Sequence, residues 1–230
     1  NFVSFSQQIN GVDLLDKAIT YHDPQNKWET FNGTFYVTME TPKNSNRTSE
    51  ISINLPEEQF YLKVKKDTLI TAYDLNKDAC TISLNGKTNL TDTVLKANNL
   101  SCKRANLYKN YYTYLYGLPM KLKDNGTIIH EKVERKTFKG KPYLVLKATY
   151  DAAVGKDIWY FYFNPKTFAM EVYQFYKTDD KGNIKKDSGE YILLTGEEIV
   201  NGIKMPKTRA WYYNKNDTYL GTDILSPIKH

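Results

Sequence analysis

The segment IWYFYF, residues 158–163, carries apolar or aromatic side chains on both faces of a predicted β-strand. Successive side chains of a strand point to opposite faces, which divides the segment into two sets: Ile158, Tyr160 and Tyr162, and Trp159, Phe161 and Phe163. An apolar surface on both faces is typical of a strand that is covered on both sides. One face of the sheet must therefore meet a helix or a bound apolar ligand.

Most of the remaining chain shows the same two-residue period. Apolar and polar side chains alternate from residue 35 to residue 84, and again from residue 128 to the segment YLGTDIL at 219–225. Turn sequences separate the later segments, among them Lys139-Gly140, Asp180 to Asn183, and Asn201-Gly202. The pattern predicts an α+β chain that is mainly antiparallel β, with a meander in the first half and consecutive hairpins in the second.

Two segments with the helical period flank the first group of strands. Residues 12–22 have one apolar face and end before Pro24, which cannot continue a helix. We interpret His22 as a cation that completes the C-terminus of this helix. Residues 91–98 form a short turn or helix capped by Thr91.

The longest predicted helix covers residues 102–117 and carries a broad stripe of large side chains: Tyr108, Tyr111, Tyr112 and Leu115. Gly117 suits the left-handed position that ends many helices. Because a residue before proline is biased toward extended backbone, Leu118 should leave the helix in that conformation before Pro119.

An aromatic helix beside a sheet with two apolar faces is compatible with two arrangements. The helix is either plain core, or a lid over an incompletely filled cavity in a curved sheet. We expect the stripe to cover the concave face, with Trp159, Phe161 and Phe163, or their alternates Tyr160 and Tyr162, opposite it. Leu118 and Met120 share one parity on an extended segment and would line the mouth of the cavity, where methionine adapts to variable apolar shapes.

The composition narrows the classes of partner. The 230 residues include 19 tyrosines, and the formal net charge is +6 with no run of five like charges. Lysines among acids are typical of a solvated surface, and no nucleic-acid-binding motif is present, so we expect no nucleic-acid partner. No apolar run is long enough to predict a transmembrane segment. We keep open a tether to the membrane through an N-terminal lipid anchor lost before residue 1.

Cys80 and Cys102 are the two cysteines of the chain, and they bracket a polar excursion. In a reducing compartment they would be two unrelated buried thiols, whereas in an oxidising compartment such a pair typically forms a staple. We predict an intramolecular disulfide.

Residues that carry chemistry are sparse. The three histidines, His22, His130 and His230, stand at no metal-ligand spacing, and no nucleophile elbow, phosphate loop or dinucleotide fingerprint is present. We therefore expect no enzyme, no cofactor and no metal site.

Three short motifs carry a resemblance to a known family: YHDP at 21–24, YLYGLPMKLKDNGT at 114–127, and EEIVNGIKMPKT at 197–208. With the order of elements, they resemble the Lol-type lipoprotein-carrier superfamily, and more closely a branch of envelope proteins from Bacteroidetes-type bacteria. The resemblance implies a strongly curved, incomplete antiparallel β-barrel whose concave face is covered by helices. It also implies a periplasmic or outer-membrane-associated location.

The resemblance implies one Lol-type domain over residues 10–230, preceded by a flexible segment at 1–9. It further implies a non-enzymatic function, the binding or transport of a lipid or lipidated protein in the cell envelope. The alternative is a structural or protein-interaction module that fills its own core and takes no ligand. Neither the ligand nor the oligomeric state follows from the sequence.

Overall fold

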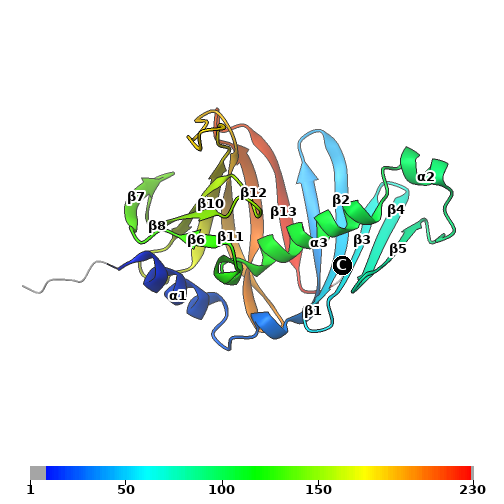
Figure 1. Cartoon of the computed structure of the whole chain (residues 1–230), viewed down its shortest axis with the longest axis horizontal. Helices are drawn as coiled ribbons and strands as arrows, with labels where there is room; N and C mark the ends of the chain where they lie inside the picture. The colour runs from blue at the N-terminus through cyan, green and yellow to red at the C-terminus, as the bar shows by residue number, and fades with distance from the viewer. Residues whose placement is uncertain (1–8, 229–230) are drawn as a thin grey trace, which may run out of the picture.

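The computed structural model describes residues 9–228, in which thirteen strands form one antiparallel sheet (Figure 1). The strands are β1 (Asn32–Thr41), β2 (Asn44–Asn54), β3 (Gln59–Lys66), β4 (Leu69–Asn76), β5 (Ala79–Leu84), β6 (Thr127–Ile129), β7 (Glu134–Phe138), β8 (Lys141–Tyr150), β9 (Ile158–Phe163), β10 (Met170–Tyr176), β11 (Glu190–Val200), β12 (Ile203–Tyr213) and β13 (Tyr219–Ser226). The helices are α1 (Gly11–His22), α2 (Asp92–Ala97) and α3 (Cys102–Gly117), with short 3₁₀ turns η1 (Trp28–Thr30) and η2 (Met120–Lys123).

The order of the strands confirms the predicted meander and hairpins. From one edge to the other it is β5-β4-β3-β2-β1-β13-β12-β11-β10-β9-β8-β6, with β7 paired to β8. The Lys139-Gly140 and Asn201-Gly202 turns join consecutive strands with positive φ at both positions, as two-residue hairpins require. β1, the first strand of the first half, pairs with β13, the last strand of the second half. This long-range pair makes the two halves one sheet.

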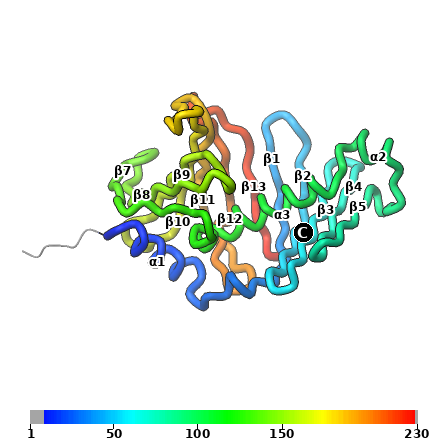
Figure 2. The backbone as a smooth tube through the Cα atoms, viewed as in Figure 1, coloured from blue at the N-terminus to red at the C-terminus, as the bar shows by residue number. Residues whose placement is uncertain are grey.

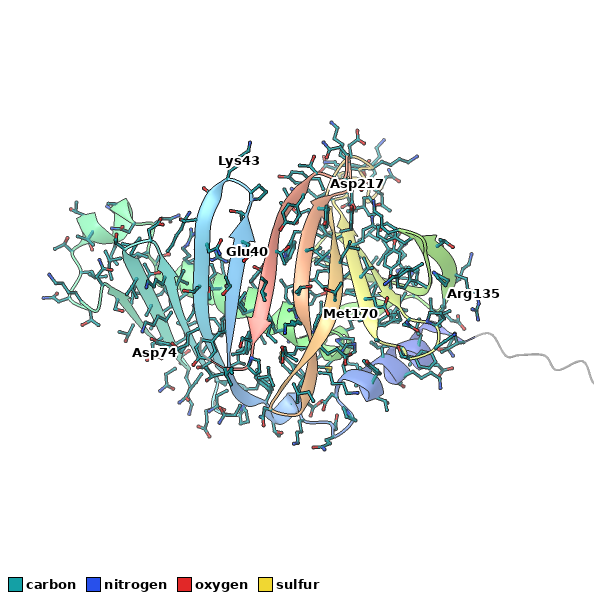
Figure 3. All side chains as sticks on the ribbon, turned by 180° about the vertical axis from the view of Figure 1, so that it is seen from behind. Glu40, Lys43, Asp74, Arg135, Met170 and Asp217 are labelled. Atoms are coloured by element: carbon teal, nitrogen blue, oxygen red, sulfur yellow. A yellow bond between two sulfur atoms is a disulfide. The ribbon has the colours of Figure 1, made fainter. Side chains whose placement is uncertain are left out.

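The helices lie on one side of this sheet. Figures 1 and 2 show α3 crossing in front of the strands. The helix α1 lies against the other half of the sheet, where it contacts β8 and β12. Figure 3 shows the opposite face, where the strands lie in front of α3. The predicted fold class is confirmed: the sheet is mainly antiparallel, open and curved, and helices cover its concave face.

The inner face carries the main core, because the two-residue period points one apolar set of each strand toward the helices. Phe35, Ile51 and Leu62, from three adjacent strands, are fully buried there. In β9 the inner set is Trp159, Phe161 and Phe163, which pack in the same cluster. Of the two sets that the sequence left open, Trp159, Phe161 and Phe163 face the helices, and Tyr160 and Tyr162 lie on the outer face.

The outer face of β9 is covered as well. Tyr162 packs with Tyr143, Val145 and Val172 in a second, smaller cluster. The ring of Phe138, at the end of β7, lies 5.2 Å from that of Tyr162. The expectation that IWYFYF is covered on both faces is confirmed.

His22 ties α1 to the sheet, and its interpretation as a cation is wrong. The backbone N–H of Met170 donates to Nε2 at 2.9 Å, so Nδ1 carries the proton and donates to the Lys204 carbonyl at 2.7 Å. Burial lowers the pKa of this imidazole. A neutral ring that bonds two strands completes the end of α1.

The end of α3 differs from the prediction at Gly117. This residue has no positive φ and belongs to the helix; an added Cβ would lie 2.1 Å from Cζ2 of Trp28. Glycine is therefore required by the close approach of the Trp28 ring. Leu118 is extended as predicted, with φ −68° and ψ 140°. Met120 then begins η2, so the predicted extended segment through Leu118 and Met120 is wrong.

The predicted flexible segment at 1–9 falls, except for residue 9, outside the described residues. None of the helices within residues 9–228 combines the length and the apolar character that a membrane span needs.

Candidate functional site

The first turn of α3 is fixed to the edge of the sheet by a disulfide. Cys80 of β5 is bonded to Cys102, the first residue of α3, which confirms the predicted pair. The Ser101 side chain caps the same turn by accepting from the backbone N–H of Arg104 at 3.1 Å. A covalent bond and a cap thus place the start of α3 above β4 and β5.

The aromatic stripe of α3 faces the sheet, as predicted, with a gradient of burial. Tyr112 and Leu115 are buried, and Tyr108 packs against Tyr73 of β4. Tyr111 lies at the border with 42% of its side chain exposed. Burial, and next the charge of Asp223, raises the pKa of Tyr111 well above its usual range.

A groove of about 660 Å³ opens along this border of α3. Leu107, Tyr108, Tyr111 and Tyr112 form its helical wall. The sheet supplies the other residues from five strands, β1, β2, β11, β12 and β13: Met39, Arg47, Glu190, Trp211, Leu220, Gly221, Thr222 and Asp223. We call this the tyrosine groove. Three of the predicted ligand-binding residues, Tyr108, Tyr111 and Tyr112, therefore line one space.

The sheet side of the tyrosine groove, which we call its floor, carries charged side chains among apolar ones. Met39 of β1 lies opposite Arg47 of β2 on one side and opposite Asp223 of β13 on the other. Trp211 donates from Nε1 to Asp223 at 3.0 Å. Burial raises the pKa of the Asp223 carboxyl, and the charge of Arg209 partly opposes that rise. Arg47 and Asp223 therefore stand on the floor with Met39 between them, and Glu190 is a second acid that lines the groove.

A further buried polar group lies behind this floor. Arg209 of β12 is opposite Asp223 in the sheet register and is 1% exposed. Its guanidinium stacks over the ring of Tyr116, 3.9 Å from the centroid, and its Nη1 donates to the Pro206 carbonyl at 3.1 Å. Burial raises the pKa of both Tyr116 and Tyr173 beside it. The side chains beneath the middle of α3 are thus tyrosines and charges.

The remaining predicted site residues lie elsewhere. Leu115, Leu118, Met120, Phe161 and Phe163 are buried in the main core and line neither the tyrosine groove nor the groove on the other side of α3. We call this set the filled end of the concave face. Trp159 lines the second groove, of about 810 Å³, with Tyr114 and Tyr150, whose hydroxyls are hydrogen-bonded.

Sequence reasoning missed Arg47, Asp223 and Arg209. Each occupies an inward position of an alternating strand, where an apolar residue is the rule. A charge at such a position is the signal that could have found Arg209 in TRAWYYN and Asp223 in YLGTDIL. Within residues 9–228, no group of three or more metal-ligating side chains comes together.

An open, curved antiparallel sheet with helices on its concave face defines the LolA-like fold. A LolA superfamily protein from Nitrosomonas europaea has this fold, with a TM-score of 0.53, 11% sequence identity, and coverage of 95% of this chain and 92% of that chain. A DUF1329 family protein from Desulfovibrio piger gives a TM-score of 0.49 and 9% identity over 95% of this chain and 92% of that chain.

The chain belongs to DUF6503, a family of unknown function, whose model matches residues 2–226. No curated protein matches the sequence. The fold agrees with the one that the Lol-type resemblance implies.

Proposed function

We propose that this protein binds or carries a hydrophobic ligand, a lipid or a lipidated protein, outside the cytoplasm in the bacterial cell envelope, without catalysing a reaction. One observation carries the proposal: the aromatic border of α3 is not sealed against the sheet, and the tyrosine groove beside it has the size of a ligand pocket. The disulfide supports an oxidising compartment. The LolA-like fold supports the class of function by analogy.

The walls of the groove suit an apolar chain. Leu107 is 60% exposed, Tyr111 is half-exposed, and both stand on the helical wall. Each methylene group that such a wall removes from water contributes about 0.8 kcal/mol. A ring of Tyr111 can contact the chain while its hydroxyl keeps a polar neighbour. The buried members of the predicted set, such as Leu118 and Phe161, would meet the ligand only if α3 lifts from the sheet.

The alternative, a module that fills its own core, is favoured by the filled end, where five of the nine predicted residues pack against other side chains of this chain. Binding of a fluorescent fatty-acyl probe distinguishes the two functions. We expect the parent protein to bind the probe, and Leu107→Asp with Tyr111→Asp to weaken binding more than tenfold, because each change removes apolar contact and adds a charge.

Val12→Asp is the matched control, since Val12 is 56% exposed on α1 and lies outside the groove. It should bind the probe as the parent does. Melting curves of all variants show whether the fold is kept. A parent protein that never binds the probe, or a folded double variant that binds it unchanged, overturns the proposal in favour of the self-filled module.

A further inference from the structure

The buried polar groups that lack a partner gather under α3. In residues 9–228, the buried side-chain nitrogen and oxygen atoms without a hydrogen bond are Thr41 Oγ1, Arg47 Nε, Ser49 Oγ, Tyr116 Oη, Tyr173 Oη and Arg209 Nε. Arg47, Ser49, Tyr173 and Arg209 occupy inward positions of the sheet and Tyr116 the sheet-facing side of α3, while Thr41 lies beyond the register shift that follows Met39. A buried polar atom without a partner is costly and needs an explanation.

The two arginines define what is missing. A guanidinium only donates hydrogen bonds, so the absent partner of Arg47 Nε and of Arg209 Nε is an acceptor. Neither arginine forms an ion pair within the described part of the chain. The register explains this for Arg47, because β1 lies between it and Asp223, and two strand spacings amount to about 10 Å. Hydroxyls of serine and tyrosine can donate to the same acceptor.

The remaining charges near the floor do not supply that acceptor. Asp223 already accepts from Trp211 and faces Arg209. Glu190 lines the groove on β11 and forms no ion pair with either arginine in the described part of the chain. Arg47 is thus the one described groove-lining residue that combines a full positive charge with an unpartnered buried donor.

We propose that the tyrosine groove binds an acidic amphiphile, whose carboxylate or phosphate oxygens accept hydrogen bonds from Arg47 while its apolar chain lies along Leu107 and Tyr111. This inference rests on the proposed function and specifies its ligand. The groove has Arg47 and Asp223 on its sheet side and the exposed side chain of Leu107 on its helical wall. A planar guanidinium is suited to both carboxylate and phosphate, because it offers parallel N–H donors to two oxygens.

Binding of hexadecanol, hexadecanoic acid and hexadecyl phosphate, measured by displacement of a fluorescent acyl probe at neutral pH, tests the inference without any mutation. We expect both acids to bind about tenfold or more tightly than the alcohol, because a charge-assisted hydrogen bond is lost with the neutral head. Inorganic phosphate alone should not displace the probe, since the apolar chain supplies much of the affinity.

Arg47→Gln should remove the preference for the acids over hexadecanol. Lys43→Gln removes the same charge at the exposed tip of the β1–β2 hairpin (Figure 3) and should keep the preference. Arg47→Lys retains the positive charge but loses the parallel N–H donors of the guanidinium, and should keep part of the preference for the acids. If Arg47→Gln does not fold, the alcohol comparison on the parent decides.

The outcomes separate the two proposals. Binding of neither alcohol nor acids overturns the proposed function. Equal binding of alcohol and acids keeps the proposed function and overturns the acidic ligand, as does an unchanged preference in folded Arg47→Gln. If inorganic phosphate displaces the probe as effectively as hexadecyl phosphate does, the groove binds anions without using the apolar chain of the ligand. That result also overturns the inference.

Discussion

Two neighbouring regions of the concave face are built from the same kind of alternating strand but are completed differently. At the filled end, Phe161, Phe163 and Leu118 meet other apolar side chains, and the one buried imidazole nearby, His22, has both ring nitrogens bonded. Beneath the middle of α3, Arg209 and Ser49 are equally buried, as is Tyr173, the cross-strand partner of Phe161 at the border of the filled end, yet each leaves a polar atom unpaired. The difference shows that burial alone does not identify core: the filled end is packed with apolar side chains, whereas the region beneath α3 holds buried polar atoms that lack a partner.

The largest effect should come from the filled end. Phe161→Ala removes a fully buried ring and should lower the free energy of unfolding by about 3–5 kcal/mol. Tyr111→Ala, on the border of the tyrosine groove, removes a ring of similar size that is 42% exposed and should cost about 1 kcal/mol or less. Urea denaturation measures both. Equal losses for the two variants would mean that the border of α3 is as tightly packed as the filled end.

Removal of the disulfide should loosen the end that carries the site. Cys80→Ala with Cys102→Ala opens a loop with a sequence separation of 22 residues and should cost about 3 kcal/mol. Because Cys102 is the first residue of α3, the amide protons of the early turns of α3 should exchange faster, and those of β9 should change less. Uniform acceleration across both regions would contradict a local anchoring function for this bond.

A smaller difference in stability should separate the loss of a hydrogen-bonded tyrosine hydroxyl from the loss of an unpartnered one. Tyr162 donates to Gln174 at 2.6 Å on the outer face, so Tyr162→Phe should cost about 1–2 kcal/mol. Tyr173→Phe removes an unpartnered hydroxyl beneath α3 and should leave stability unchanged or raise it by up to about 1 kcal/mol. Thermal melts without ligand compare the two. A clear loss in Tyr173→Phe would show that its hydroxyl is bonded in solution.

The smallest effect concerns His22 and acid. Its pKa is lower in the folded protein than the ordinary value of 6.5, so the unfolded chain binds more protons once the pH falls below that value. The stabilising contribution is therefore complete above about pH 6.5 and is lost progressively as the pH falls toward the folded pKa. His22→Gln should melt at a lower temperature at about pH 8, and the gap to the parent should narrow at about pH 5. A gap that is constant across this range would contradict a neutral buried imidazole.

Local sequence was sufficient for the elements themselves. The two-residue period separated inner from outer side chains in β1, β2, β3 and β9, and the helical period with Thr91 and Pro119 delimited the helices. These signals depend on the few residues before and after each position. The disulfide between Cys80 and Cys102 could also be predicted, because their spacing and the inferred compartment constrain the same pair.

Only the tertiary structure decided which set of β9 faces α3, that Gly117 makes room for Trp28, and that Arg47, Asp223 and Arg209 stand in one row across the sheet. Parity assigns two faces but does not say which is concave, since that depends on where α3 lies. The row depends on the pairing of β1 with β13, whose residues are separated by most of the chain. The elements of this protein follow from contacts near in sequence, and its candidate site follows from contacts between segments that only the folded sheet brings together.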